Sequence, residues 1–478
     1  MKKPFIKLFS TPNNYYFFDV NKDEIVLISF TAYQYLYKVL NDLESNDLEI
    51  PQEILILQNN GYLEDKSRVQ KIKHPYTEYL EEFLNRKLSK ITLQLTQNCN
   101  LRCRYCVYSE THNDGQRTHS NKHMTWETAK KAIDFLRKHS IDSHNINIGL
   151  YGGEPLLEYP LLKRIVEYSE RVFSGKKLTF AMTSNATLLT DEIIHYLAEH
   201  KVSLMVSLDG PKEINDKNRV FKNGDGSYDS VIENIKRIYS LEPQYADTLS
   251  ISMVMDPQND FDCINSITLD FNDLFWPSIH SSVVDQSFDG KSKPTSSPNF
   301  IAAYTYQSFL SYLSYLKRIP EKITSPITYY SVVSSLNIDY DLSNPMPLNV
   351  VDVPGGPCIP CHLRMLIDVN GQFFPCERVS ETSPVMNCGN LETGFNIEQV
   401  KYLLNVAQIT ESQCKNCWAF RHCSMCAKQA DSGGTTLSAE KRLANCLETQ
   451  TRLKNRIQEY LFIKEIPIIY QNQVKSGE

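Results

Sequence analysis

The chain of 478 residues is long enough for roughly two to four domains. Hydrophobic residues make up 41% and charged residues 22% of it, a globular balance that excludes a disordered or collagen-like chain. Lys and Arg number 50 against 56 Asp and Glu, a formal net charge of −6. No overall positive field therefore predicts a nucleic-acid partner or an anionic membrane surface.

We expect no secretory signal at the N-terminus. Its apolar residues are interrupted by Lys7 and by the turn-forming segment 11–14, so no signal-peptide core forms. No run of 18 apolar residues occurs in the chain, so a membrane-spanning helix is not expected. We expect a cytoplasmic protein with no membrane partner, whose thiols stay reduced.

Residues 1–85 predict a small antiparallel sheet followed by helices. Thr31 is the expected N-cap of the first helix, and Pro51 opens the second, which ends near Asn60-Gly61. We expect this block to be a winged-helix domain. The expected strands are the apolar runs 5–9, 15–19 and 24–29.

Residues 86–290 change to short apolar strands that alternate with amphipathic helices, the pattern of parallel βα units. Thr125, Thr190 and Ser227 are the expected caps of three of these helices. The pattern predicts an α/β fold, a partial (β/α)6 TIM barrel, with its chemistry in the loops that follow the strands. The expected strands are 91–95, 146–150, 178–182, 203–208, 249–255 and 279–284.

Residues 291–350 are expected to form a linker and helical bridge to the last domain. The segment 285–298 is rich in Ser, Lys, Pro and Gly and predicts an exposed loop, and a helix is expected near 302–317. Residues 351–478 are dense in cysteine and short of apolar residues. We expect this last block to have a small core that depends on metal–thiolate bonds.

The 13 cysteines fall into two clusters. Three lie between Cys99 and Cys106 and nine between Cys358 and Cys446, whereas Cys263 stands apart. An odd number of cysteines in a reducing compartment makes a poor disulfide framework. Clusters of this kind typically hold a metal or an iron–sulfur group.

Cys99, Cys103 and Cys106 have the spacing C-x3-C-x2-C and directly follow the first expected barrel strand. Three thiolates on one loop can hold three irons of a [4Fe–4S] cube and leave the fourth iron open to a substrate. Zinc binding is the alternative. It needs four ligands, and the candidate for the fourth, His112, has an untypical spacing.

A second signal, Tyr151-Gly152-Gly153-Glu154-Pro155, directly follows the second expected strand. Two glycines let a ligand approach the backbone closely, and the carboxylate of Glu154 can accept a hydrogen bond from an ammonium group. Alone, this segment is an ordinary strand-to-helix turn. Together with the cysteine loop, in which the aromatic Tyr105 precedes the last cysteine, it resembles the radical S-adenosylmethionine (SAM) enzymes.

This resemblance implies that SAM chelates the open iron and that one electron cleaves it to a 5′-deoxyadenosyl radical, which abstracts hydrogen from unactivated carbon. It also implies a ribose contact by Ser207 and a carboxylate contact by Arg219, for which a strand-end hydrogen bond and a surface ion pair are the alternatives. The expected cofactor-binding residues are Tyr105, Gly152, Gly153, Glu154, Ser184, Asn185, Ser207 and Arg219.

The last cysteine array resembles the SPASM extension of radical SAM enzymes, which carries two auxiliary [4Fe–4S] clusters. The array departs from that pattern before Cys426, where the spacing is x2 and not x3. Four-cysteine zinc sites are the alternative, and Cys388 and Cys263 are expected to be ordinary small apolar residues. The resemblance assigns Cys358, Cys361, Cys376 and Cys426 to the first auxiliary cluster, and Cys414, Cys417, Cys423 and Cys446 to the second, which makes three [4Fe–4S] clusters with the SAM-binding one.

Glu377 directly follows Cys376 and is the candidate catalytic residue. In related maturases an acidic residue at this place can act as a base. A thiol with a pKa near ~8.5 needs a base or an iron to become a thiolate at neutral pH. A salt bridge to Arg364 or Arg378 is the alternative.

Residues 1–85 also resemble the winged-helix recognition element (RRE) of maturases that modify ribosomally synthesised peptides, which binds a leader peptide at a sheet edge. A DNA-binding winged helix is the alternative, but it would need a basic recognition helix, and 31–41 offers only Lys38. We therefore expect a peptide partner and no nucleic acid.

The whole chain looks most like the radical SAM/SPASM maturases of Cys-rich peptides, the ranthipeptide and sactipeptide type. The resemblance implies a peptide-modifying oxidoreductase that joins a cysteine sulfur to a carbon of another residue in a leader-bearing Cys-rich precursor, with an electron donor such as flavodoxin or ferredoxin. Two alternatives stay open. One is a SPASM maturase that forms a carbon–carbon crosslink or oxidises a Cys or Ser, as sulfatase-maturating relatives do. The other is a non-enzymatic zinc or iron–sulfur regulator that binds nucleic acid.

Overall fold

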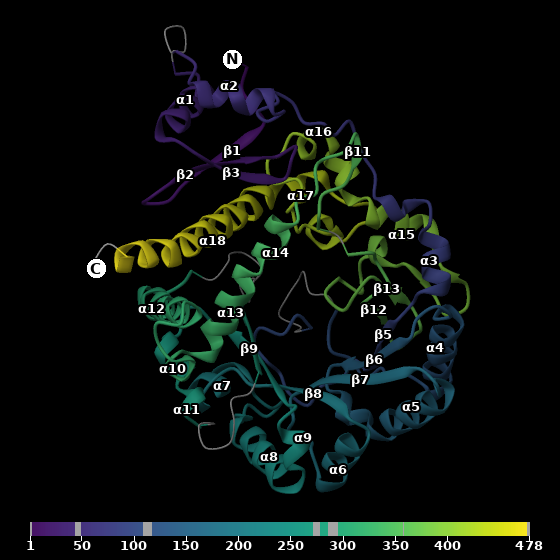
Figure 1. Ribbon diagram of the computed structural model, residues 1–478. Helices are drawn as coiled ribbons and strands as arrows, with labels where there is room; N and C mark the ends of the chain where they lie inside the picture. Colours follow the sequence, from purple (N-terminus) through teal and green to yellow (C-terminus); the bar gives the residue numbers. More distant parts are fainter. Residues whose placement is uncertain are drawn as a thin grey trace.

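The computed structural model describes residues 2–43, 49–108, 117–270, 278–284, 295–356 and 358–475. The expected ligand His112 and the loop residues 285–294 lie outside this part of the chain. The N-terminal sheet sits at one end of the molecule, the barrel at the other, and the C-terminal segment between them (Figure 1). No helix among the described residues is both long enough and apolar enough to cross a membrane.

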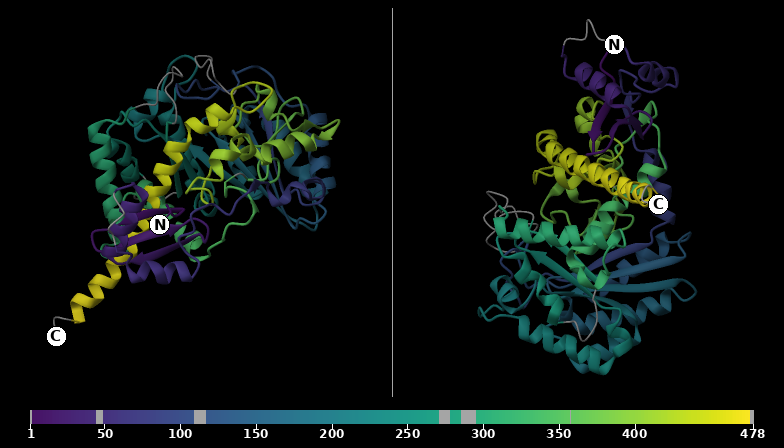
Figure 2. Two further views of the ribbon diagram at one scale, coloured as in Figure 1. Left: turned by 90° about the horizontal axis from the view of Figure 1, so that it is seen from above. Right: turned by 60° about the vertical axis from the view of Figure 1, so that its left-hand side comes forward.

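The N-terminal sheet has the order β1-β2-β3, and all of its pairings are antiparallel. Alternate residues of the middle strand face opposite sides, as the strand period requires. Phe17 packs against the helices α1 and α2, whereas Phe18 packs against the C-terminal segment, including Leu453 of the last helix, α18. The second view in Figure 2 shows that helix directly beneath the sheet. The elements are β1 (Ile6–Ser10), β2 (Tyr15–Asp19), β3 (Glu24–Ile28), α1 (Phe30–Leu40), α2 (Gln52–Asn59), β4 (Lys71–Ile72), α3 (Leu80–Arg86) and α18 (Cys446–Lys475).

The expected cap of α1 was wrong by two residues. Ser29 is the N-cap: its backbone is extended and its side chain accepts a hydrogen bond from the Ala32 amide. Thr31 lies inside the first helical turn. The prediction for α2 is confirmed, because Pro51 precedes its first residue and the helix ends at Asn59.

All six expected barrel strands are present as β5 to β10, paired in parallel and in chain order. This confirms the α/β fold with a mostly parallel sheet. The elements of this region are β5 (Lys90–Thr96), α4 (Trp126–His139), β6 (Asn145–Gly152), α5 (Tyr159–Val172), β7 (Lys177–Ser184), α6 (Asp191–Glu199), β8 (Val202–Ser207), α7 (Lys212–Asn218), α8 (Tyr228–Leu241), α9 (Pro243–Ala246), β9 (Ser250–Met255), α10 (Phe261–Asn265), α11 (Ile267–Asp270) and β10 (Ser278–Val283).

The caps Thr125 and Thr190 are confirmed, because their side chains accept hydrogen bonds from the Thr128 and Ile193 amides. Ser227 is also confirmed as the residue at the N-cap position of α8. Its hydroxyl, however, makes no capping bond and instead donates to the Arg219 carbonyl at 2.8 Å. Tertiary contacts therefore take the hydroxyl away from the helix end.

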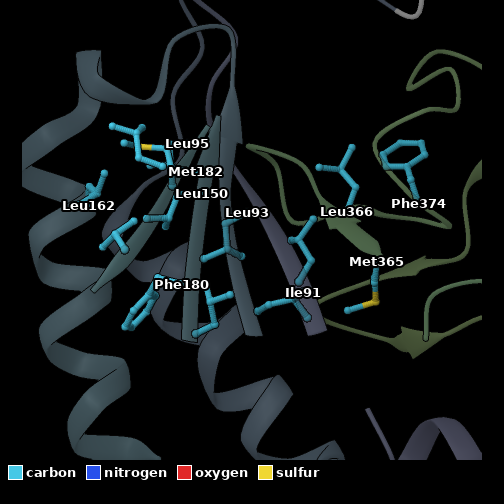
Figure 3. Packing of buried hydrophobic residues seen from close by; sticks show 14 of the residues in the cluster. Ile91, Leu93, Leu95, Leu150, Leu162, Phe180, Met182, Met365, Leu366 and Phe374 are labelled. Atoms are coloured by element: carbon cyan, nitrogen blue, oxygen red, sulfur yellow. The ribbon is translucent and has the colours of Figure 1, made fainter. Parts of the chain in front are cut away.

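The helices cover one face of the sheet. Alternate strand residues such as Leu93 and Leu95 of β5 point into this layer, together with Leu150, Met182 and Leu162 of α5 (Figure 3). The residues between them, such as Gln94, lie on the opposite face because the side chains of a strand alternate. That second face is the inside of the partial barrel.

The C-terminal segment extends the barrel sheet, which the sequence did not predict. β12 pairs in parallel with β5, and β13 pairs with β12, so the sheet has eight strands. Strands of two or three residues are too short to leave a periodic signal. The elements after the barrel are α12 (Pro298–Tyr315), α13 (Pro326–Leu336), α14 (Ile338–Ser343), β11 (Val351–Asp352), β12 (Met365–Ile367), β13 (Phe373–Phe374), β14 (Gly389–Asn390), β15 (Gly394–Phe395), α15 (Ile397–Leu404), α16 (Glu411–Cys414) and α17 (Ala439–Ala444).

The last block shares its buried apolar residues with other parts of the chain, and its dependence on metal–thiolate bonds stays a prediction. Met365, Leu366 and Phe374 belong to the same buried cluster as the barrel residues (Figure 3). Leu403 and Leu404 of α15 join it as well. Residues further along the block, such as Phe420 and Leu453, belong instead to the buried cluster that contains Phe18 of the N-terminal sheet.

Candidate active site

The cysteine loop 99–106 lies at the carboxyl end of β5. The segment after α7 holds it in place: the Arg102 amide donates to the Val220 carbonyl at 2.7 Å, and the Arg104 amide donates to the Asn218 carbonyl at 3.0 Å. A loop fixed by backbone hydrogen bonds at both of these positions presents its side chains in one arrangement. The loop occupies the edge of the sheet where barrel enzymes carry their chemistry.

The three thiols of this loop lie close together, with Cys99 buried and Cys103 and Cys106 half-buried. Burial raises the pKa of Cys99 to about 11, and the neighbouring thiol of Cys106 adds to the shift. Burial likewise raises the pKa of Cys103 to about 12, with contributions from both other thiols. A thiol held so far above its ordinary pKa stays protonated until a metal displaces the proton.

Polar side chains from three other segments reach these sulfur atoms. Asn185 Nδ2 lies 3.9 Å from Cys99 Sγ, and Arg219 Nη1 lies 4.0 Å from Cys103 Sγ. His119 Nε2 lies 4.0 Å from Cys106 Sγ, a contact that sequence reasoning missed. Its spacing from the cysteines matches no ligand pattern, so the sequence carried no signal for it.

The Gly-Gly-Glu segment packs directly on the backbone that leads into the cysteine loop. A Cβ on Gly153 would lie 2.1 Å from the Asn98 carbonyl oxygen, and a Cβ on Gly152 would lie 2.3 Å from that of Thr96. The Gly153 amide donates to the Thr96 carbonyl at 2.9 Å, and the Glu154 amide donates to the Asn98 carbonyl at 3.0 Å. The glycines are therefore required because two strand ends meet without room for a side chain.

The carboxylate of Glu154 is buried and accepts three hydrogen bonds. The donors are the Leu156 amide at 3.0 Å, the Ser184 hydroxyl at 2.8 Å and the Asn185 amide at 2.7 Å. Burial raises its pKa, although these donors counteract the shift. A carboxylate has about four lone-pair positions, so one remains for a further donor. The structure thus brings Glu154, Ser184 and Asn185 together beside Cys99.

Arg219 and Tyr105 share one buried partner, Asp209. The Arg219 Nε atom lies 3.0 Å from Asp209 Oδ1, and the Tyr105 hydroxyl donates to Asp209 Oδ2. The Val254 amide donates to the same carboxylate at 3.0 Å. Asp209 orients both expected SAM contacts and was not among the expected site residues, although it lies two residues after Ser207, which was. Ser207 ends β8 and is half-buried.

A second buried ion pair lies on the inner face of the sheet. Arg117 Nε is 3.2 Å from Glu381 Oε1, and both side chains are at most 5% exposed. Gln94 of β5 donates to both oxygens of Glu381, and the guanidinium stacks 3.7 Å from the centre of the Tyr108 ring. The Nη2 atom of Arg117 has no partner among the described residues. Sequence reasoning missed the pair because its members are 264 residues apart.

The structure also brings together the first of the two expected auxiliary sets. Burial raises the pKa of Cys358, and the thiols of Cys376 and Cys426 add to the shift. Cys361 is wholly buried with a left-handed backbone, φ +62°, and lies close to Cys376 and Cys358. The thiol of Cys388, which is buried in the apolar core as expected, also contributes to the raised pKa of Cys361.

The second expected set comes together likewise. Burial raises the pKa of Cys417 to about 11, and the neighbouring thiols of Cys423, Cys414 and Cys446 add to this shift. The two sets are adjacent. Gly356, two residues before Cys358 of the first set, packs on the backbone of Cys423 of the second set, and a Cβ on Gly356 would lie 2.1 Å from the Cys423 carbonyl oxygen. Within the part of the chain that the structure describes, no three His, Cys, Asp or Glu side chains converge tightly enough to hold a single metal ion.

The candidate base Glu377 is engaged in an ion pair. Arg364 donates to both of its carboxylate oxygens, with 3.3 Å between Arg364 Nε and Glu377 Oε2. This is the salt bridge that the sequence left as the alternative, and the Glu377 side chain keeps 17% exposure. Cys263 is not a buried apolar residue: its thiol donates to Glu213 at 3.3 Å.

These donor sets fit the groups that the resemblance implies. Three neighbouring thiols on one loop, with His119 in contact with one of them, suit a cluster that keeps one iron open. The spare lone pair of Glu154 and the guanidinium of Arg219 lie next to that loop and suit the ammonium and carboxylate groups of SAM.

A partial parallel barrel with this loop after its first strand defines a class of enzyme. Residues 93–269 match the radical SAM superfamily. The chain therefore carries a radical SAM domain, as the motifs predicted.

Three relatives place this domain in context. An uncharacterized protein of Methanocaldococcus jannaschii, MJ0907, is 35% identical over 172 residues, 36% of this chain and 54% of that protein. The radical SAM cyclopropyl synthase TigE of Paramaledivibacter caminithermalis is 23% identical over 413 residues, 81% of this chain and 82% of TigE. The serine-type anaerobic sulfatase-maturating enzyme of Bacteroides thetaiotaomicron is 33% identical over 141 residues, which are 29% of this chain and 33% of that enzyme. The match thus spans about half or less of two of these relatives.

Solved structures share the fold. Native anSMEcpe with bound AdoMet has a TM-score of 0.55 at 17% identity, covering 78% of this chain and 99% of that chain. Native anSMEcpe with bound AdoMet and Cp18Cys peptide has a TM-score of 0.54 at 17% identity, again covering 78% and 99%. At these identities the likeness establishes a common fold.

Proposed function

We propose that this protein is a radical SAM maturase that forms thioether crosslinks in a Cys-rich precursor peptide. The observation that carries the radical chemistry is the gathering of Cys99, Cys103 and Cys106 beside Glu154 and Arg219 at the carboxyl end of β5. The peptide substrate is supported by the N-terminal sheet and by relatives whose names describe protein maturation.

The residues of the chain divide the work of holding the cofactors. Cys99, Cys103 and Cys106 would bind a [4Fe–4S] cluster, and Glu154 and Arg219 would hold the amino and carboxylate groups of SAM. When bound, these groups supply a radical able to remove one hydrogen atom from a substrate carbon. Asp209 keeps Arg219 in position through the 3.0 Å ion pair, and the buried surroundings exclude water.

The remaining residues would manage the proton and the electron. Joining a thiol sulfur to the carbon that lost its hydrogen atom releases one proton and one electron. In this proposal Glu377 would take the proton once Arg364 releases the carboxylate. Auxiliary clusters, when bound, would supply an acceptor for the electron, with a flavodoxin or ferredoxin as the external partner. Cys358, Cys361, Cys376 and Cys426 would hold one auxiliary cluster, and Cys414, Cys417, Cys423 and Cys446 the other.

The N-terminal block would bind the leader of the precursor. Among the described residues β3 has a single neighbour in its sheet, so its outer edge can pair with an extended peptide. Leu27 on this strand is 59% exposed and Phe30, which follows it, is 51% exposed. In this proposal residues 1–85 recognise the leader, 86–290 carry the radical chemistry, 291–350 bridge them and 351–478 hold the auxiliary clusters.

Carbon–carbon bond formation is the second candidate. It is favoured by TigE, since the match to this cyclopropyl synthase extends over 81% of the chain. Oxidation of a Cys or Ser is the third candidate outcome. Its support from sequence is narrower than that from TigE, because the match to the sulfatase-maturating enzyme covers 29% of the chain.

Anaerobic reconstitution with a Cys-rich precursor encoded beside the gene tests the proposal. A thioether lowers the peptide mass by two hydrogens and protects one cysteine from alkylation, whereas a carbon–carbon bond lowers the mass equally but leaves every thiol reactive. The triple variant Cys99→Ala, Cys103→Ala, Cys106→Ala should form no 5′-deoxyadenosine and still bind iron in the C-terminal segment. SAM cleavage by this variant, or zinc in place of iron by elemental analysis, would overturn the proposal.

A further inference from the structure

Arg442, on α17, is a wholly buried cation without a counter-ion among the described residues. Its relative exposure is 0%, and it is the largest of the fully buried side chains. Nε donates to the Thr410 hydroxyl at 3.2 Å, but Nη1 and Nη2 have no hydrogen-bond partner in the part of the chain that the structure describes. A buried guanidinium in this state is strongly destabilising unless an anion compensates it.

No carboxylate of the described residues supplies that compensation. Their buried Asp and Glu ion pairs all involve other cations, and Arg442 takes part in none of them. Two cysteines lie close to Arg442, one at its backbone and one beyond the partner of its side chain. The Cys446 thiol lies 3.9 Å from the Arg442 carbonyl oxygen, and the Thr410 hydroxyl that accepts from Arg442 Nε lies 3.1 Å from Cys414 Sγ.

The unpaired N–H groups of Arg442 lie within the segment that carries two of the four thiols of this set. Arg442 is four residues before Cys446, and its Nε partner Thr410 is four residues before Cys414 and contacts that sulfur atom. An uncharged thiol gains little from a neighbouring cation, whereas a thiolate gains much. The unpaired N–H groups therefore indicate that these sulfur atoms carry negative charge in the working protein.

We propose that Arg442 is the counter-ion of a metal–thiolate cluster held by Cys414, Cys417, Cys423 and Cys446, and that it raises the reduction potential of this cluster. The proposal rests on the second auxiliary cluster of the proposed function. Net charge and hydrogen bonds to sulfur are among the factors that set such potentials. A fixed cation stabilises the reduced cluster, which carries one more negative charge, so the cluster accepts an electron more readily.

Redox titration of the iron-loaded full-length protein tests this role. The measurements use the Cys99→Ala, Cys103→Ala, Cys106→Ala background, and the cluster is identified as the electron paramagnetic resonance signal that Cys417→Ala removes. Arg442→Met should shift the midpoint potential to more negative values. At a fixed applied potential the ratio of reduced to oxidised cluster should fall at least about tenfold, which corresponds to about 59 mV for one electron. Arg442→Lys, which keeps the charge but loses the planar fork, should shift it less.

The control is Arg456→Met, which removes the same charge from α18, where Arg456 donates to the Ser335 carbonyl at 2.8 Å. It should leave the potential unchanged. If Arg442→Met does not fold or does not bind iron, the midpoint potential of the cluster in Arg442→Lys becomes the test of the role of Arg442. Wild-type potentials in the Arg442 variants that load iron would overturn the role of Arg442 alone, whereas retention of all iron by Cys417→Ala would overturn the second cluster itself.

Discussion

Glu381 of the C-terminal segment forms a buried ion pair with Arg117, which follows the cysteine loop in the chain, at 3.2 Å between Oε1 and Nε. The pair joins the C-terminal segment to the inner face of the barrel sheet through Gln94, which donates to both carboxylate oxygens. Placement of the C-terminal segment and placement of the cysteine loop are therefore coupled.

Arg117→Met should lower the free energy of unfolding by about 3 to 5 kcal/mol, because it leaves the Glu381 carboxylate buried without its cation. The double variant with Glu381→Gln should recover part of this loss, since no unpaired charge remains. Urea denaturation of the four proteins of this double-mutant cycle measures the coupling. Additive effects of the two substitutions would show that the pair contributes nothing to stability.

Glu465 should anchor the N-terminal sheet to α18 in a pH-dependent way. Its buried carboxylate accepts from Tyr16 at 2.6 Å, from Thr11 at 2.7 Å and from Asn14 at 2.9 Å. Burial raises the pKa of Glu465, but these donors outweigh it and the net shift is downward. The anchoring is therefore fully present above the ordinary pKa near 4.5 and is lost as the pH falls through the lowered value.

Glu465→Gln tests this by removing the charge at every pH. At pH 7 it should cost about 2 kcal/mol, the usual scale for a hydrogen bond to a charged group. The difference from the wild type should shrink at about pH 4, because the Glu465 carboxyl of the unfolded wild-type chain binds a proton there more readily than that of the folded chain. Urea midpoints of both proteins at the two pH values measure it, with the surface variant Glu448→Gln as the control, which should change stability by less than about 1 kcal/mol.

Gly153→Ala should displace the cysteine loop. Its new methyl group would lie 2.1 Å from a backbone carbonyl oxygen that cannot rotate away. We expect loss of most of the iron bound by the first cluster and at least a tenfold drop in 5′-deoxyadenosine formation. Gly434→Ala is the matched control, because its nearest atom is 4.0 Å away. Equal iron content in the two variants would contradict the assigned packing.

Leu27→Lys should weaken binding of the leader peptide about tenfold without changing stability by more than about 0.5 kcal/mol. The side chain is 59% exposed on the open edge of the N-terminal sheet, so its loss removes a contact only when a peptide is present. Ile141→Lys is the control, since Ile141 is 60% exposed in the barrel region. Fluorescence anisotropy with a labelled precursor measures binding, and equal affinity of the two variants would exclude this edge as the docking site.

The sequence determined the barrel and its first loop because their signals are local. Apolar runs of strand length alternate with capped helices, and three cysteines with a fixed spacing directly follow β5. Such patterns depend on neighbours within one element, so six strands and three barrel helix starts were predicted correctly. The Ser227 hydroxyl makes no capping bond because a tertiary partner, the Arg219 carbonyl, competes for it.

Contacts between distant segments were decided only by the tertiary structure. Arg117 and Glu381, the unpaired Arg442 beside its cysteines, and the pairing of β12 with β5 have no local signature. Packing chooses these partners because a buried charge or strand edge must be satisfied by whatever the fold brings near. A sequence shows which groups need partners, and the folded chain determines which partners they find.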